Sequence, residues 1–205
     1  MAAARKRIAV LVSGRGSNLA ALLRQDCGGD VVVVASNKAD AGGLAIAREA
    51  GIATFALDAR QFADRAAFDA ALVAALNEHA PDLVVLAGFM RILSPQFTMA
   101  FAGRLINIHP SLLPSFTGLD THARALAEGV KLHGCTVHFV TAELDRGPII
   151  AQAAVQVEDD DTPETLAARV LVQEHQLLPH AVRLFCQGRL RIDGARVRVQ
   201  PPAAA

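Results

Sequence analysis

The segment IAVLVSGRGSN, from Ile8 to Asn18, indicates the fold class of this chain. Its first five residues are all apolar, which is typical of a strand covered on both faces in a parallel sheet. The glycine-containing loop from Ser13 to Asn18 then opens a stretch with helical spacing. A strand, a glycine loop and a helix in this order predict an α/β fold.

Further apolar runs repeat this pattern along the chain, most of them separated by Ala- and Leu-rich stretches with helical spacing. The runs lie at 31–35, 53–57, 83–87 and 105–108. They predict a Rossmann-like, mostly parallel sheet flanked by helices up to about residue 110. Runs at 132–141 and 148–157 predict antiparallel additions to the sheet in the C-terminal half.

The last third of the chain carries clear helix and hairpin signals. Thr162 is a candidate N-cap, Pro163 suits the first helical position, and Glu164 follows it, so a long helix is expected to run to about Gln187. Two short runs joined through an Asp-Gly pair predict a hairpin over 189–199. A shorter helix is expected near 122–128.

Length and composition favour one globular domain over 1–205. The chain has 205 residues, of which 52% are hydrophobic. We expect a phosphate-binding half at about 8–110, and a second part at about 111–192 with a lid loop, a turn containing Asp145 and the long helix.

The charge balance and the cysteines exclude several function classes. Twenty basic and twenty acidic residues cancel, which argues against nucleic acid or an anionic membrane as partner. The longest apolar run, Leu83 to Met90, is far shorter than the roughly 20 residues of a membrane span. Three distant cysteines without CxxC spacing indicate neither a disulfide framework nor a structural metal site, so we expect a cytoplasmic protein.

The loop at 13–18 is a candidate phosphate site, because backbone N–H groups at the start of a helix bind anions. An NAD site is disfavoured, since Leu19 stands where a dinucleotide fingerprint has its third glycine. The alternative is a tight turn in which Ser17 or Asn18 only caps the helix.

Asn107 and His109 end the apolar run at 105–108 and lie two residues apart, so they share one face of a strand. The amide of Asn107 can donate to an oxygen that becomes negative during attack on a carbonyl. His109 can supply or relay a proton. This pairing suits acyl or formyl transfer.

Asp145 is the candidate partner of His109, because a carboxylate beside an imidazole stabilises the imidazolium. It lies in the segment ELDRGP at 143–148, between the two late runs. The alternative is a purely structural role in that turn. His138 lies in one of those runs, and either packing or support of the site suits it equally. His79, His122, His133 and His180 are expected to be surface or capping groups.

These segments resemble the phosphoribosylglycinamide formyltransferases over nearly the whole chain. The matching motifs are SGRGSN at 13–18, SNKADAGGLAIAREAGI at 36–52, LVVLAGFMRILSPQF at 83–97, GRLINIHPSLLPSFTGLDTH at 103–122, HGCTVHFVTAELDRGPII at 133–150 and QEH at 173–175. Several blocks in the same order make chance agreement implausible. Thr117 and Asp120 depart from residues that relatives often carry in the loop after Pro114.

The resemblance implies transfer of a formyl group from 10-formyltetrahydrofolate to the amine of glycinamide ribonucleotide in purine biosynthesis. The catalytic residues would be Asn107, His109 and Asp145, with no metal. The residues implied for the ribonucleotide are Gly16, Ser17, Asn18 and Glu174. Those implied for the folate are Arg65, Met90, Arg91, Ile92, Leu93 and Asn107. The protein would be a monomer or a homodimer.

Three other functions compete with this one. Formyltetrahydrofolate hydrolases share the folate site but carry an additional amino-terminal domain, and methionyl-tRNA formyltransferases add a carboxyl-terminal RNA-binding domain; the length of this chain argues against both. A non-catalytic nucleotide or phosphate sensor is the third, and the intact Asn107 and His109 pair argues against it.

Overall fold

A computed structural model describes residues 4–202. Its single sheet has nine strands in the order β3-β2-β1-β4-β5-β6-β7-β9-β8. The strands are β1 (Lys6–Val12), β2 (Gly29–Ser36), β3 (Ala53–Ala56), β4 (Leu83–Leu86), β5 (Leu105–His109), β6 (Leu132–Phe139), β7 (Ile149–Gln156), β8 (Leu190–Asp193) and β9 (Arg196–Val199). The first five run parallel to one another, whereas β6 is antiparallel to both β5 and β7. The predicted fold class is confirmed.

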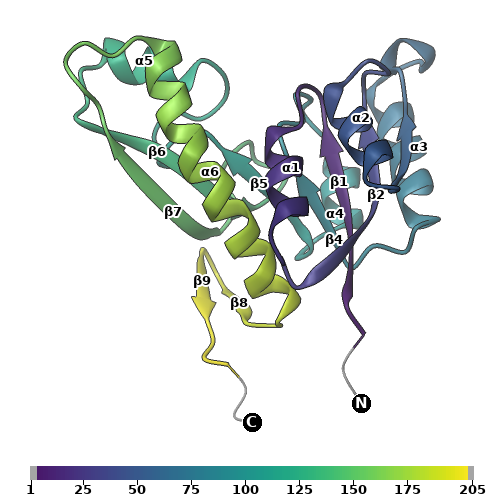
Figure 1. Cartoon of the computed structure of the whole chain (residues 1–205). Helices are drawn as coiled ribbons and strands as arrows, with labels where there is room; N and C mark the ends of the chain where they lie inside the picture. The colour runs from purple at the N-terminus through teal and green to yellow at the C-terminus, as the bar shows by residue number, and fades with distance from the viewer. Residues whose placement is uncertain (1–3, 203–205) are drawn as a thin grey trace.

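Helices cover both faces of the sheet (Figure 1). They are α1 (Ser17–Arg24), α2 (Gly42–Glu49), α3 (Arg65–Asn77), α4 (Pro95–Ala100), α5 (Thr121–Ala127) and α6 (Pro163–Cys186), with a 3-10 turn at Ala59–Gln61. Alternate residues of β1 enter two different clusters of buried side chains. Ile8 and Val10 pack with α1 and α6, whereas Ala9 and Leu11 pack with α3 and α4. This explains why β1 is apolar without interruption.

The helix and strand signals read from the sequence agree closely with the structure. Thr162 caps α6, and its side chain accepts from the backbone N–H of Thr165, whose own side chain accepts from the N–H of Thr162. This reciprocal cap, with Pro163 behind it, explains why the longest helix begins where it does. The expected hairpin is also present, as β8 and β9.

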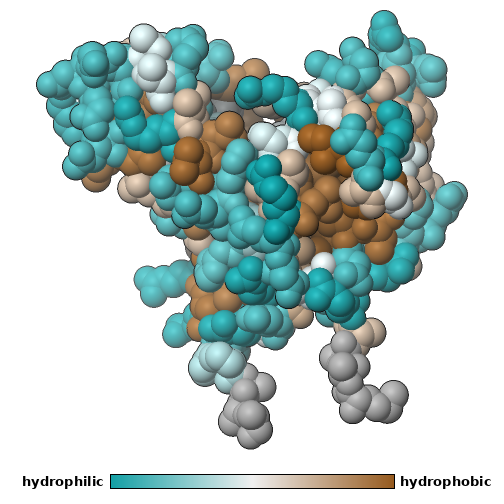
Figure 2. Space-filling model, in the orientation of Figure 1, coloured by the Kyte–Doolittle hydropathy of each residue, from teal (hydrophilic) through white to brown (hydrophobic). Residues whose placement is uncertain are grey.

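The chain order places a topological switch point between β1 and β4. From β1 the chain proceeds to β2 and β3 on one side of the sheet, and then returns to β4 and β5 on the other side. Loops that leave neighbouring strands in opposite directions open a crevice at their carboxyl ends. Figure 2 shows a hollow in the surface at the carboxyl ends of the strands, between the part of the molecule that contains α5 and the part that contains α2. None of the helices within residues 4–202 combines the length and apolar composition that crossing a membrane requires.

Candidate active site

Asn107 and His109 lie at the carboxyl end of β5 and share one face of the sheet, as their spacing predicts. The ladder with β6 places His138 directly opposite Asn107, and Thr136 directly opposite His109. The intervening Ile108 is buried against the other face. Two antiparallel strands therefore bring four polar side chains together at the point where the sheet stops being parallel.

The imidazole of His109 is buried between two oxygen atoms. Its Nε2 lies 2.9 Å from the carbonyl oxygen of Phe116, and its Nδ1 lies 3.6 Å from Oδ2 of Asp145. Because a carbonyl oxygen only accepts, Nε2 carries the hydrogen of that bond. Nδ1 then faces a carboxylate, which can stabilise positive charge on the ring.

Asp145 reaches this position from the turn between β6 and β7. Its backbone is left-handed, with φ of 53°, which aspartate tolerates better than most residues. Oδ2 accepts a hydrogen bond of 2.8 Å from the backbone N–H of Gly118, in the loop before α5. At Gly147 a Cβ atom would collide with the carbonyl oxygen of Phe139, so only glycine lets this turn lie against the end of β6.

The loop after β1 leads into α1 through a glycine with a left-handed backbone. Gly16 is the N-cap of α1 with φ of 80°, and no side chain caps the helix. The alternative that Ser17 or Asn18 caps α1 is therefore wrong. Asn18 instead donates from Nδ2 to Oε2 of Glu174 on α6, at 2.7 Å. Burial raises the pKa of Glu174, and the hydrogen bond from Asn18 opposes that rise.

The loop after β4 is held beside the loop after β1. The hydroxyl oxygen of Ser13 accepts from the backbone N–H of Met90 at 2.8 Å. Met90 and Ile92 expose 69% and 60% of their surface, which is unusual for large apolar side chains. The guanidinium of Arg91 lies over the ring of Phe68, 4.5 Å from its centroid. Arg65 lies three residues before Phe68 on α3, so the side chains of Arg65 and Arg91 both lie near the start of that helix.

The predicted site residues therefore fall into three neighbouring groups. Leu86 at the end of β4 pairs with Asn107, so the loop that contains Met90 to Leu93 begins beside the catalytic candidates. β1 lies on the other side of β4 and carries the glycine loop. Arg91 is part of that same loop, and its guanidinium lies over Phe68 of α3, the helix that begins with Arg65.

Comparison with known proteins gives a family for this arrangement. A family model described as formyl transferase matches residues 6–182. The chain is 50% identical to the phosphoribosylglycinamide formyltransferase of Escherichia coli (strain K12), over 96% of this chain and 98% of that protein. The chain belongs to the phosphoribosylglycinamide formyltransferases.

Solved structures agree with this membership. The crystal structure of glycinamide ribonucleotide transformylase 1 from Symbiobacterium toebii superposes with a TM-score of 0.94 at 50% identity, covering 96% of this chain and 95% of that one. A formyltetrahydrofolate deformylase from Pseudomonas syringae superposes with a TM-score of 0.90 at 31% identity, covering 97% and 67%. The fold is thus shared between a formyltransferase and a deformylase, and the higher identity lies with the formyltransferase.

Substitution of Gly16 tests the glycine loop of this formyltransferase. At Gly16→Ala a Cβ atom would collide with Cα of Gly43 on α2, and the positive φ adds strain. We expect the free energy of unfolding to fall by about 1–3 kcal/mol. Gly14→Ala is the matched control, because its Cβ would meet nothing within 4 Å. Urea unfolding followed by circular dichroism measures both, and equal losses would contradict the expectation.

His133 corrects one expectation from the sequence, because it is buried and not a surface or capping group. Its Nε2 lies 3.2 Å from Nδ1 of His122 on α5, and its ring packs edge-on against Phe116. Burial is the main cause that lowers the pKa of His133 to about 4, and the neighbouring imidazole of His122, which disfavours a second positive charge, adds to the decrease. Burial also lowers the pKa of His122. Two neutral imidazoles therefore support the loop whose carbonyl holds His109.

This histidine pair predicts acid sensitivity. In the unfolded chain a histidine has a pKa of about 6.5, so the unfolded chain binds more protons than the folded protein between pH 6.5 and about 4. We expect the free energy of unfolding to decrease as the pH falls through this window. In His133→Phe the decrease is smaller, whereas His180→Phe, at an exposed histidine, keeps the wild-type slope. Urea unfolding at pH 7.5, 6 and 5 measures it, and equal slopes in all three proteins would refute the assignment.

Sequence reasoning missed the contacts that backbone groups make in the site. The carbonyl of Phe116 and the N–H of Gly118 carry no signal in a residue pattern, because every residue has them. The position of Ser13 directly after the first strand is a signal in the sequence that could have identified it as a site residue. Its contact with Met90 could not be predicted, because that contact forms only when the chain returns to β4.

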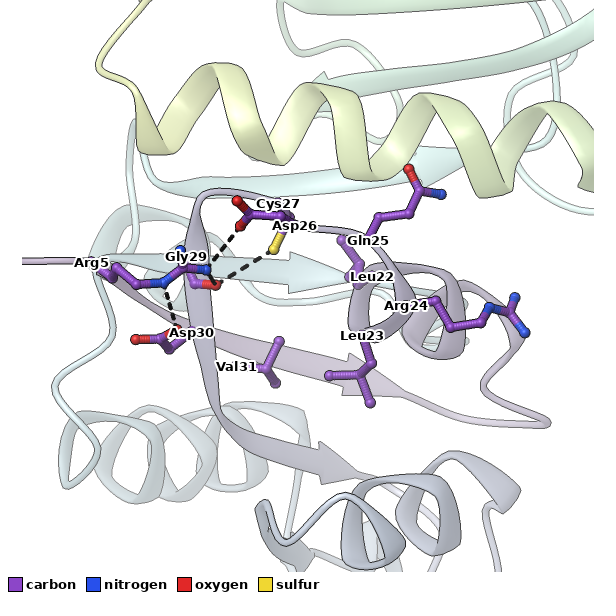
Figure 3. Close-up of a pocket in the computed structure, with 10 residues that line it drawn as sticks. All are labelled: Arg5, Leu22, Leu23, Arg24, Gln25, Asp26, Cys27, Gly29, Asp30 and Val31. Atoms are coloured by element: carbon purple, nitrogen blue, oxygen red, sulfur yellow. Dashed lines mark hydrogen bonds and ion pairs between the residues drawn. The ribbon is translucent and has the colours of Figure 1, made fainter.

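A second hollow lies at the other end of the strands, where β1 and β2 begin (Figure 3). It is lined by Arg5, Leu22, Leu23, Arg24, Gln25, Asp26, Cys27, Gly29, Asp30 and Val31. Arg5 is paired there with Asp26 at 3.0 Å and with Asp30 at 2.7 Å. Arg5, Asp26 and Asp30 are thus paired with one another, and the hollow lies at the opposite end of the strands from the candidate site.

Proposed function

We propose that this protein transfers a formyl group from 10-formyltetrahydrofolate to the amine of glycinamide ribonucleotide, giving the formylated ribonucleotide and tetrahydrofolate. The observation that carries the proposal is the position of His109, whose two ring nitrogens face oxygens of Phe116 and Asp145 beside the amide of Asn107. Family membership and the arrangement of the crevice support the same reaction.

The ribonucleotide is proposed to bind across α1 and α6. The backbone at Gly16 and Ser17 opens α1 without a side-chain cap, which suits a phosphate. Asn18 and Glu174 are hydrogen-bonded to each other close by, and Glu174 offers its carboxylate to the ribose hydroxyls. This would direct the amine of the substrate toward the end of β5.

The formyl donor is proposed to lie along the loop from Met90 to Leu93. Exposed apolar side chains at Met90 and Ile92 suit a flat ring system, and the cations Arg65 and Arg91 suit its acidic tail. The residues present therefore fit a folate. When bound, the folate supplies an activated formyl carbon.

The residues at the end of β5 would perform the transfer. Asn107 would donate its amide N–H to the formyl oxygen as negative charge develops there. The substrate amine would form a bond to the formyl carbon. His109, with its Nε2 released from the carbonyl of Phe116, would donate a hydrogen bond to the same developing oxyanion, while Asp145 stabilises positive charge on the imidazole. The bond between the formyl carbon and the folate nitrogen would then break, and the proton lost by the amine would pass to that nitrogen through water. No serine or cysteine side chain within residues 4–202 is hydrogen-bonded to His109, so the substrate amine is proposed to attack directly.

A two-arm assay tests the proposed function. The purified protein is mixed with 10-formyltetrahydrofolate, with and without glycinamide ribonucleotide, while folate absorbance, formate and formylated product are followed. We expect product only when the ribonucleotide is present. Formate release at the same rate in both arms would identify a hydrolase, the activity named for the Pseudomonas syringae relative. No reaction in either arm would overturn the proposal.

The assembly and cellular location are also proposals. We infer a monomer or homodimer in the cytoplasm, the location that three distant cysteines without a disulfide framework favour. The neutral charge balance favours small molecules as partners. Sedimentation equilibrium would determine the assembly.

A further inference from the structure

His138 is a polar side chain in contact with Asn107 that the proposed mechanism does not use. It lies opposite Asn107 in the β5–β6 ladder and is buried, with 1% of its surface exposed. Its Nε2 lies 3.2 Å from Nδ2 of Asn107, and its Nδ1 lies 2.9 Å from the carbonyl oxygen of Phe139. Both ring nitrogens therefore have partners that belong to the protein.

These two contacts determine where the hydrogen on the ring is. The carbonyl of Phe139 can only accept, so Nδ1 of His138 carries a hydrogen. In a neutral ring Nε2 is then an acceptor, and it must face the NH2 group of Asn107, not its oxygen. A ring with the hydrogen on Nε2 would leave two acceptors facing each other at Phe139.

We propose that His138 is a positioning residue that sets which way the amide of Asn107 points. As a neutral acceptor it holds one N–H of Asn107, so the second N–H is directed to the formyl oxygen. The proposal rests on the proposed function for its kinetic consequence, whereas the hydrogen-bond arrangement does not depend on the reaction.

The charges around His138 agree with a neutral ring. Burial lowers its pKa, which outweighs the opposite effects of the Phe139 carbonyl and of Asp145, whose Oδ1 lies 3.9 Å from Nε2. His109 also lowers the pKa. The residue opposite His138 on β7 is the uncharged Ile149. If Nε2 became protonated, it would attract the oxygen of Asn107 and turn the amide away from the formyl group.

A double-mutant cycle separates this role from simple packing. We expect His138→Leu to lower kcat roughly 10- to 100-fold with KM for both substrates changed less than about 3-fold, because only the direction of a transition-state donor is lost. Added to Asn107→Ala, the same substitution should cost less than about 2-fold more. An equal loss in both backgrounds, or no loss in the single variant, would overturn the proposal.

Two further proteins keep the test decisive. His138→Gln offers a side-chain oxygen as acceptor, and we expect it to recover at least about half of the lost activity on a logarithmic scale. If His138→Leu does not fold, His138→Gln takes its place in the cycle. A loss of kcat in His138→Gln that is equally large with and without Asn107→Ala would then overturn the proposal. His180→Leu, at an exposed histidine, controls for the loss of an imidazole as such.

Nitrogen-15 NMR of labelled imidazoles tests the arrangement without substrate. At pH 7 we expect His138 to be neutral with its hydrogen on Nδ1. A hydrogen on Nε2, or a charged ring, would overturn the proposal. If the NMR result is as expected and the protein releases formate without forming product, the proposed function fails while the orientation of Asn107 stands, and the cycle is then run on formate release.

Discussion

Asp145→Asn is expected to lower kcat by about 10²- to 10⁴-fold, the range that positioned proton transfer contributes. The carboxylate lies 3.6 Å from Nδ1 of His109 and is buried with it. An amide of the same size keeps an oxygen for the N–H of Gly118, so the loop stays anchored while the negative charge is lost. The effect should therefore fall on the chemical step and leave substrate binding almost unchanged.

A matched control distinguishes this explanation from a general effect of removing a carboxylate. Asp160→Asn, at an exposed carboxylate in the turn before α6, should keep the wild-type kcat. An unchanged kcat in Asp145→Asn, or an equal loss in Asp160→Asn, would refute the pairing of Asp145 with His109.

Asn107→Ala is expected to lower kcat by about 10²- to 10³-fold, corresponding to about 3–4 kcal/mol of transition-state stabilisation. The lost N–H would act only on the oxygen that becomes negative, so KM for both substrates should change little. Single-turnover measurement of product formation isolates this step from product release. An increase in KM with unchanged kcat would show that Asn107 only binds substrate.

The same variant leaves the Nε2 acceptor of His138 without its partner, which predicts a modest loss of stability of about 1–3 kcal/mol. Thermal unfolding by circular dichroism is the suitable measurement, because the chain contains no Trp or Tyr for fluorescence. Asn77→Ala, at the exposed end of α3, controls for removal of an amide. The kinetic comparison is made at a temperature at which all three proteins are folded.

Local signals explain what could be predicted from the sequence. The face shared by Asn107 and His109 follows from the two-residue period of a strand, and the start of α6 follows from Thr162 and Pro163. The change from parallel to antiparallel strands was visible in the altered spacing after Pro114. Each of these features depends on residues close together in the chain.

The features of the site that could not be predicted depend on residues far apart in the sequence that the fold brings together. Asn18 and Glu174 are 156 positions apart, and no local pattern connects them. The burial of His133 depends on how the segment with Phe116 and α5 folds back over β6. The residue pattern does not reveal this burial, because a single histidine has no period that shows what will cover it.

The register between β5 and β6 limits where this chain can gain or lose residues during evolution. Asn107 faces His138 and His109 faces Thr136 only in the present register. One residue inserted within either strand would turn half of these side chains to the opposite face of the sheet, while the backbone ladder could still form. Natural insertions and deletions are therefore expected to be absent from the two strands.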